Sequence, residues 1–113
     1  MNLTLKDIRS LQKAFDKKHN VSNKSFYVDI DSSNLEELEH LVVCLIGELG
    51  EFSNILKKVT RGDFELKDVK DSLDEELVDT FIYLIKIANQ FNVNLEEGYL
   101  KKLEKNKERF NEI

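Results

Sequence analysis

The sequence has no proline and no tryptophan, and it has only four glycines and one cysteine in 113 residues. Proline and glycine are the residues that most often interrupt helices, so their scarcity favours long, continuous helices. The single cysteine, Cys44, excludes a disulfide bond within the chain. Its apolar neighbours Val43 and Leu45 indicate a role in core packing rather than in reactivity.

Positive charge is also in short supply, since 17 Lys and Arg face 22 Asp and Glu and the formal net charge is -5. An acidic chain argues against a nucleic-acid-binding surface, so a phosphate-bearing partner should be small and metal-bound. No apolar run reaches membrane-spanning length, and the N-terminal stretch MNLTLKDIRS is too polar for a signal peptide. We therefore expect a cytoplasmic protein that binds neither nucleic acid nor membranes.

Hydrophobic residues make up 41% and charged residues 35% of the sequence, which is typical of a charge-rich helical protein rather than of a disordered one. The length predicts a single domain, residues 1–113, with one core. Apolar residues recur every three or four positions in four segments, the spacing of amphipathic helices. The predicted helices cover residues 4–18, 35–59, 72–91 and 94–110. Residues 20–34 are predicted to form a loop, and a linker of mixed helical character follows residues 61–63.

Residues that accept hydrogen bonds from backbone N–H groups stand before each predicted helix. The expected caps are Thr4 or Asn2, then Ser33 or Asn34 with Glu36 or Glu37, then Ser72 with Glu75, and finally Asn94 with Glu97. Between the caps, the second and third helices carry continuous apolar seams. The seam residues are Leu35, Leu38, Val42, Leu45, Leu49, Phe52, Leu56 and Val59, and then Leu73, Leu77, Phe81, Leu84, Ala88 and Phe91. Because one short chain cannot cover both seams, we expect an obligate oligomer.

Two acidic pairs lie beside these seams, Glu48 with Glu51 and Glu76 with Asp79. Residues three apart share one face of a helix, and an isolated carboxylate among apolar residues costs several kcal/mol unless it is paired. Two such pairs on facing helices would form a cage of oxygen ligands. Gly47 and Gly50 flank the first pair at a cost in helix stability, which suggests that a partner backbone or a ligand comes close.

An all-oxygen site without histidine favours Mg²⁺ or Mn²⁺ over zinc or copper. A di-iron site would need Glu-x-x-His motifs, and neither His19 nor His40 has that spacing. Polar residues suited to phosphate or nucleotide contacts lie downstream, with Lys102, Asn106 and Arg109 projecting the same way from the last helix. Tyr83 and Lys86 share a helix face with the second acidic pair. Taken singly, an acidic pair or the set of Lys102, Asn106 and Arg109 is also typical of a solvated helix face, and Tyr83 is also typical of a core or an interface.

In this order, the residues resemble those of the MazG-like all-α nucleoside triphosphate pyrophosphohydrolases, and look closest to the dCTP pyrophosphatase branch. The resemblance rests on three motifs and on the N-terminal Asp7-Ile8-Arg9, Leu11 and Phe15. The motifs are Gly47-Glu48-Leu49-Gly50-Glu51-Phe52, then Glu76-Leu77-Val78-Asp79 leading into Tyr83, then Lys102, Asn106, Arg109 and Phe110.

The resemblance implies an all-α bundle of four to five helices, completed by a second subunit in a homodimer or homotetramer. It implies Mg²⁺-dependent cleavage between the α and β phosphates of a (deoxy)nucleoside triphosphate. The implied metal ligands and catalytic residues are Glu48, Glu51, Glu76 and Asp79, one of which also orients the attacking water. The implied nucleotide contacts are Tyr83, Lys102, Asn106 and Arg109, with Lys102 and Arg109 able to reach in from a neighbouring subunit.

The sequence departs from the family pattern at three places. Gly47 stands where many members have a glutamate, so no general base is assigned there. Gln12 takes the position of a histidine in the dCTP pyrophosphatase branch and becomes a candidate substrate contact. Tryptophans that surround the base in that branch are absent, which leaves Phe26, Tyr27 or Phe52 as candidates for base stacking.

The sequence thus predicts a Mg²⁺-dependent nucleotide pyrophosphohydrolase that cleans the nucleotide pool. Phosphoribosyl-ATP pyrophosphohydrolase is the alternative within the same class of enzyme. The alternative from another class is a non-catalytic helical oligomerisation or regulatory module, in which the acidic cage holds a structural divalent ion or nothing.

Overall fold

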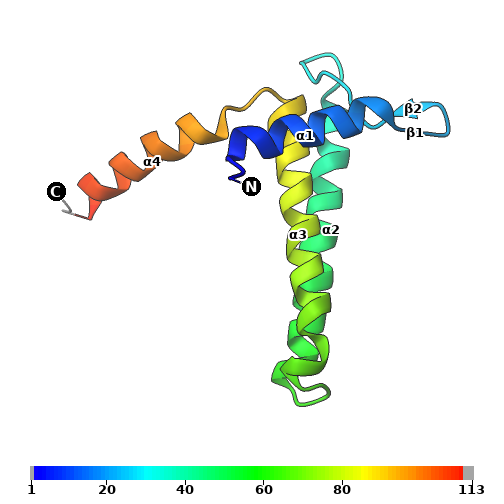
Figure 1. Cartoon of the computed structure of the whole chain (residues 1–113), viewed down its shortest axis with the longest axis vertical. Coiled ribbons are helices and arrows are strands. Elements are labelled where there is room, and N and C mark those ends of the chain that lie inside the picture. The colour runs from blue at the N-terminus through cyan, green and yellow to red at the C-terminus, as the bar shows by residue number, and fades with distance from the viewer. Residues whose placement is uncertain (1, 111–113) are drawn as a thin grey trace.

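Figure 1 shows the protein as a computed structural model, which describes residues 2–110. In chain order its elements are α1 (Leu5–Lys18), β1 (Asn20–Val21), β2 (Lys24–Ser25), α2 (Leu35–Thr60), α3 (Leu66–Gln90) and α4 (Leu95–Arg109). The predicted all-α class is confirmed, because a two-stranded ribbon is the only non-helical regular structure in the described residues. Within the same range, no helix combines the length and the hydropathy that a bilayer-spanning segment needs.

Two of the expected caps are present. Thr4 accepts a hydrogen bond from the Asp7 backbone N–H at 3.1 Å, and the Asp7 carboxylate accepts one from the Thr4 N–H at 3.0 Å. These bonds to Thr4 hold the pKa of Asp7 below its usual value. At the start of α4, Asn94 accepts a hydrogen bond from the Glu97 N–H. Both helices therefore begin where their capping residues predict.

The prediction for residues 20–34 was wrong in part, since this segment begins with an antiparallel ribbon. Asn20 pairs with Ser25 and Val21 with Lys24. The turn residues Ser22 and Asn23 have φ angles of 51° and 65°. Two consecutive residues in the left-handed region form a tight hairpin turn whose twist matches that of the strands. Two strand residues on each side are too few for an alternating sequence pattern to reveal them.

The expected start of the third helix and the expected cap of the second helix need correction, whereas the predicted range 35–59 agrees with α2. The third helix begins at Leu66 rather than Ser72, so Ser72 lies inside α3 and caps nothing. Leu66 and Val69 extend the apolar spacing backwards from Leu73, and no helix breaker stands between them. Asn34 precedes α2 but makes no capping bond, because its side chain binds the loop residues Asp29 and Asp31 instead.

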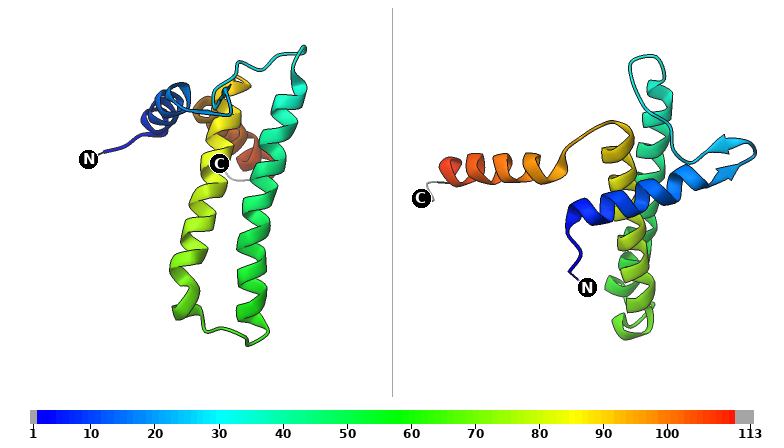
Figure 2. Two further views of the ribbon diagram at one scale, coloured as in Figure 1. Left: turned by 90° about the vertical axis from the view of Figure 1, so that its right-hand side faces the viewer. Right: turned by 45° about the horizontal axis from the view of Figure 1, so that its top comes forward.

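The long helices α2 and α3 run side by side as an antiparallel pair, but each buries only part of its predicted seam (Figure 2). On α2, Leu38, Leu45, Phe52 and Val59 are half-buried, whereas the alternating seam residues are exposed, with Leu49 at 46%. The covered face instead includes Leu41 and Cys44. On α3, Leu73 and Ala88 are buried, while four seam residues remain exposed: Leu77, Phe81, Leu84 and Phe91.

The remaining elements gather near the C-terminal end of α3. There α1 crosses α3, and Asn89 donates a hydrogen bond to the Arg9 carbonyl at 3.0 Å. The loop before α2 is held to the same end, where the Ile30 N–H donates to the Gln90 carbonyl at 2.9 Å. Figures 1 and 2 show α4 extending away from the α2–α3 pair. The core is therefore concentrated at one end of the long helices.

Replacement of Ile85, which is 1% exposed, tests this small core. We expect Ile85→Ala to lower the free energy of unfolding by about 2–5 kcal/mol, because it leaves a cavity among the helices, and Ile85→Val by only about 0.5–1.5 kcal/mol. Urea denaturation followed by circular dichroism would measure both. Equal effects of the two variants would contradict a tightly packed environment at this position.

Candidate functional site

Three carboxylates meet between the two long helices. One oxygen from each of Glu48 on α2 and Glu76 and Asp79 on α3 lies within 4.8 Å of the others, and all three residues are half-buried. Glu48 reaches this position because it is seven residues after Leu41 and four before Phe52, on the face of α2 that α3 covers. The fourth predicted ligand, Glu51, is exposed at the rim of this carboxylate cluster but lies beside Glu76.

Glu76 is the electrostatic centre of the carboxylate cluster. A hydrogen bond shared with Glu51, then one shared with Glu48, together with partial burial and repulsion from both charges, raises the pKa of Glu76 to about 7. Its Oε2 atom is buried and has no hydrogen-bond partner in the described part of the chain. A buried carboxylate oxygen without a donor is unfavourable, so this atom requires a proton or a cation.

Tyr83 lies one turn after Asp79 on α3 and connects the carboxylate cluster to a pocket. Burial raises the pKa of Tyr83, and the neighbouring Cys44, Glu48 and Asp79 raise it further. Cys44 is half-buried on the face of α2 that α3 covers, and its Sγ atom lies 3.7 Å from His40 Nε2.

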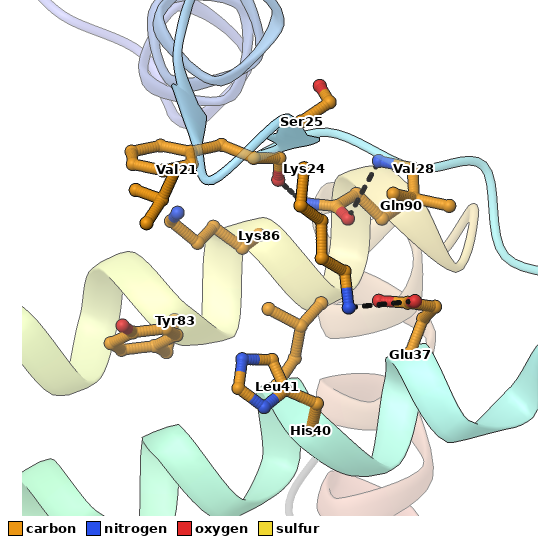
Figure 3. Close-up of a pocket in the computed structure, with 11 residues that line it drawn as sticks. Val21, Lys24, Ser25, Val28, Glu37, His40, Leu41, Tyr83, Lys86 and Gln90 are labelled. Atoms are coloured by element: carbon orange, nitrogen blue, oxygen red, sulfur yellow. Dashed lines mark hydrogen bonds and ion pairs between the residues drawn. The ribbon is translucent and has the colours of Figure 1, made fainter.

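The pocket has a volume of about 460 Å³ and lies between the β1–β2 hairpin and the adjoining ends of α2 and α3. Figure 3 shows Tyr83 and Lys86 projecting into it from α3, opposite Lys24 of the hairpin. Phe26 and Val28 supply apolar lining from the segment after the hairpin. A largely apolar cavity with a few polar groups is the usual form of a small-molecule site.

The other predicted contacts are placed less uniformly. Phe26 lines the pocket, whereas the alternative stacking residues Tyr27 and Phe52 do not. Gln12 is next to the pocket wall, where its Nε2 donates to Asp16 Oδ1 at 3.0 Å. The phosphate-contact set of α4 is not brought to the carboxylate cluster, because this helix extends away from α2 and α3 (Figure 1): Lys102, Asn106 and Arg109.

Sequence reasoning missed the buried Asp16 and the role of its partner Lys86. The Lys86 ammonium lies 3.2 Å from Asp16 Oδ1. A signal was present, because Ile8, Gln12 and Asp16 are four residues apart and so share one face of α1. The apolar stripe predicted for this helix was Leu5, Ile8, Leu11 and Phe15, of which Leu5 and Ile8 are half-buried and Leu11 and Phe15 are exposed.

No protein-family model matches the chain, and no solved structure matches it significantly. The chain is 33% identical to the Gene 37 protein of Mycobacterium phage L5 over 84 residues, which are 70% of this chain and 74% of the phage protein. It is 28% identical to dCTP pyrophosphatase 1 of Mus musculus over 111 residues and to that of Homo sapiens over 112 residues. Each of these matches covers 95% of this chain but only 59% of the mammalian protein.

The phage match exceeds the mammalian ones in identity and in the share of the relative that is covered. The mammalian matches include both acidic pairs, because they extend over nearly the whole chain. The chain belongs to the same family as the Gene 37 protein of Mycobacterium phage L5, and it is a distant relative of dCTP pyrophosphatase 1.

Proposed function

We propose that the protein is a metal-dependent nucleotide pyrophosphohydrolase that converts a deoxynucleoside triphosphate into a monophosphate and pyrophosphate, as part of nucleotide-pool cleaning. The observation that carries this proposal is the carboxylate cluster of Glu48, Glu76 and Asp79, joined through Tyr83 to a pocket. The likeness to dCTP pyrophosphatase 1 over 95% of the chain supports the same class of reaction.

The carboxylate cluster fits a divalent cation. Its oxygens are the hard ligands that Mg²⁺ and Mn²⁺ prefer, and the buried Glu76 Oε2 atom lacks any donor in the described residues. Glu48, Glu76 and Asp79 would hold the ion, with Glu51 at the rim within reach of the same site. When bound there, such an ion supplies Lewis acidity and lowers the pKa of coordinated water.

The protein's own groups would divide the remaining work. Glu51, exposed beside Glu76, is placed to orient a water molecule and accept its proton. Water then adds across the α–β anhydride, so that one phosphorus gains an oxygen and the bridging P–O bond breaks. Tyr83 stands between the cluster and the pocket and would position the sugar end of the nucleotide. Phe26 would lie against the base.

We further propose that a second copy of the chain completes the site. Exposed apolar side chains continue along both long helices, including Leu49 and Leu77, which a subunit interface would cover. Because α4 leads away from its own cluster, Lys102 and Arg109 would serve the cluster of a partner in a homodimer or homotetramer.

Substitution of the carboxylate cluster tests the catalytic proposal. We expect pyrophosphate release from a panel of deoxynucleoside triphosphates and phosphoribosyl-ATP only with Mg²⁺ or Mn²⁺, and a loss of about 10²-fold or more in kcat/KM for Glu76→Gln and Asp79→Asn. The exposed neighbour variant Glu75→Gln serves as the matched control and should retain activity. If the folded protein cleaves no compound of the panel, a non-catalytic module is favoured. If it cleaves phosphoribosyl-ATP alone, a phosphoribosyl-ATP pyrophosphohydrolase is favoured.

Glu76 also predicts how the stability of the metal-free protein depends on pH. Its pKa is about 7 when folded and near 4.5 when unfolded, so the folded state binds this proton more tightly. The stability that the proton contributes is fully present below about pH 4.5 and is lost as pH rises through about 7. In EDTA, urea denaturation from pH 5 to 8 should show wild type losing stability relative to Glu76→Gln. Parallel profiles would contradict the assignment.

Mixing of inactive variants tests the shared site. Asp79→Asn and Arg109→Ala should each be inactive alone, yet an equimolar mixture of refolded dimers should recover about a quarter of wild-type activity, because one site in each mixed dimer is intact. Light scattering would establish the oligomer in parallel. A stable monomer at micromolar concentration, or no recovery on mixing, would exclude the arrangement.

A further inference from the structure

Asp16 and Lys86 form an ion pair behind the wall of the pocket, of which Lys86 is a part. Asp16 is fully buried, and its Oδ1 atom accepts a hydrogen bond from Gln12 at 3.0 Å and lies 3.2 Å from the Lys86 ammonium. Its second oxygen, Oδ2, is buried and has no hydrogen-bond partner among the described residues. The negative charge of Asp16 is therefore compensated mainly by Lys86, which makes removal of the lysine alone costly.

This ion pair fixes the position of the Lys86 ammonium. The side chain of Lys86 is 13% exposed, and its ammonium lies 5.0 Å from the centre of the Phe26 ring and 5.5 Å from that of Tyr83. Asp16 does not line the pocket, so a bound molecule meets Lys86 and not the carboxylate behind it. An ammonium has three N–H donors and no acceptor, so its ion pair with Asp16 leaves N–H groups that can donate to a ligand.

Two other polar residues of the pocket, Lys24 and Gln90, have partners of their own. Lys24 forms an ion pair with Glu37 at 3.0 Å. The Gln90 side chain donates to the Phe26 carbonyl and accepts from the Val28 N–H, so both of its ends are used (Figure 3). Of the two pocket lysines, Lys24 has a side chain that is 62% exposed and Lys86 one that is 13% exposed, so Lys86 is the lysine held in a fixed position where it can read a ligand.

The position of Lys86 along α3 indicates which part of a nucleotide it would meet. It follows Asp79 by seven residues, which places it two helical turns, about 10 Å along the helix axis, from the nearest member of the carboxylate cluster. With the phosphates at the cluster, this separation matches the far edge of the base. This step rests on the function proposed above.

We propose that Lys86, positioned by Asp16, makes the pocket selective for nucleobases that present a carbonyl oxygen at that edge. Uracil and thymine offer O4 and guanine offers O6, and each oxygen accepts a hydrogen bond. Cytosine and adenine offer an amino group there. This amino group and the Lys86 ammonium are both hydrogen-bond donors, so neither would find an acceptor. Asp16 is a positioning residue in this scheme, and the preference differs from the substrate named for dCTP pyrophosphatase 1.

Competition among substrates tests the inference. Wild type should cleave dUTP, dTTP and dGTP with a higher kcat/KM than dCTP and dATP. The double variant Asp16→Asn/Lys86→Met leaves no unpaired buried charge and should reduce this keto-to-amino ratio at least tenfold, mainly through KM. Lys86→Arg keeps a donor-only cation and should preserve the ratio, and so should Lys24→Met, the matched control in the same pocket.

The outcomes separate this inference from the proposed function. A uniform loss across all five nucleotides would mean that Lys86 contacts phosphate or is merely structural, and would overturn the selectivity. An unchanged ratio in the folded double variant, checked by circular dichroism and thermal denaturation, would also overturn the selectivity.

Calorimetric binding of dUMP, dTMP, dGMP, dCMP and dAMP measures the base preference without hydrolysis. If the protein binds keto nucleotides preferentially but hydrolyses none of the triphosphates, only the proposed reaction is refuted. If it hydrolyses the triphosphates without a keto preference, only the role of Lys86 is refuted.

Discussion

Repulsion among carboxylates held between two helices is the constraint on which the site depends. Glu48, Glu76 and Asp79 occupy positions where a paired helix would ordinarily place hydrocarbon, and Glu76 keeps a buried oxygen without a donor. Such an arrangement weakens the α2–α3 contact when no proton or cation is present. The protein therefore carries a local instability that a bound divalent ion would relieve, and the same groups would gain a catalytic use.

The rest of the molecule is built around that pair of helices. Its core lies at the end of α3, where α1 crosses and the loop before α2 is attached. Away from this end, the long helices contact each other along one face only and leave apolar side chains such as Leu49 and Leu77 exposed. These exposed apolar faces and the outward course of α4 fit the proposed homo-oligomer, because a small chain gains stability when such faces are buried against a second copy.

The sequence predicted the helices well because apolar spacing and capping residues act locally. Thr4 and Asn94 mark helix starts through bonds to residues three positions away. The start of α3 was missed because Ser72 has the right chemistry for a cap but no breaker before it. The seam of α2 was misplaced because apolar residues surround this helix on several faces, and only the position of α3 decides which face is buried.

In the candidate site, too, the sequence predicted what depends on local spacing and missed what depends on contacts between distant helices. Spacing of three residues was enough to place Glu76 with Asp79 on one face, and their approach to Glu48 followed from the antiparallel pair. The partnership of Asp16 with Lys86 could not be read from spacing, because the two residues are 70 positions apart and their contact depends on the angle at which α1 crosses α3.

Gln90 gives this architecture a mechanical property. Its amide holds Phe26 and Val28, which follow the hairpin, against the last turn of α3, the helix that also carries Glu76, Asp79 and Tyr83. Phe26 in the pocket lining and the carboxylates Glu76 and Asp79 are thus both attached to α3. If α3 slides past α2, Phe26 moves together with Glu76 and Asp79. The distance between Phe26 and these carboxylates is then preserved, while their alignment with Glu48 on α2 changes.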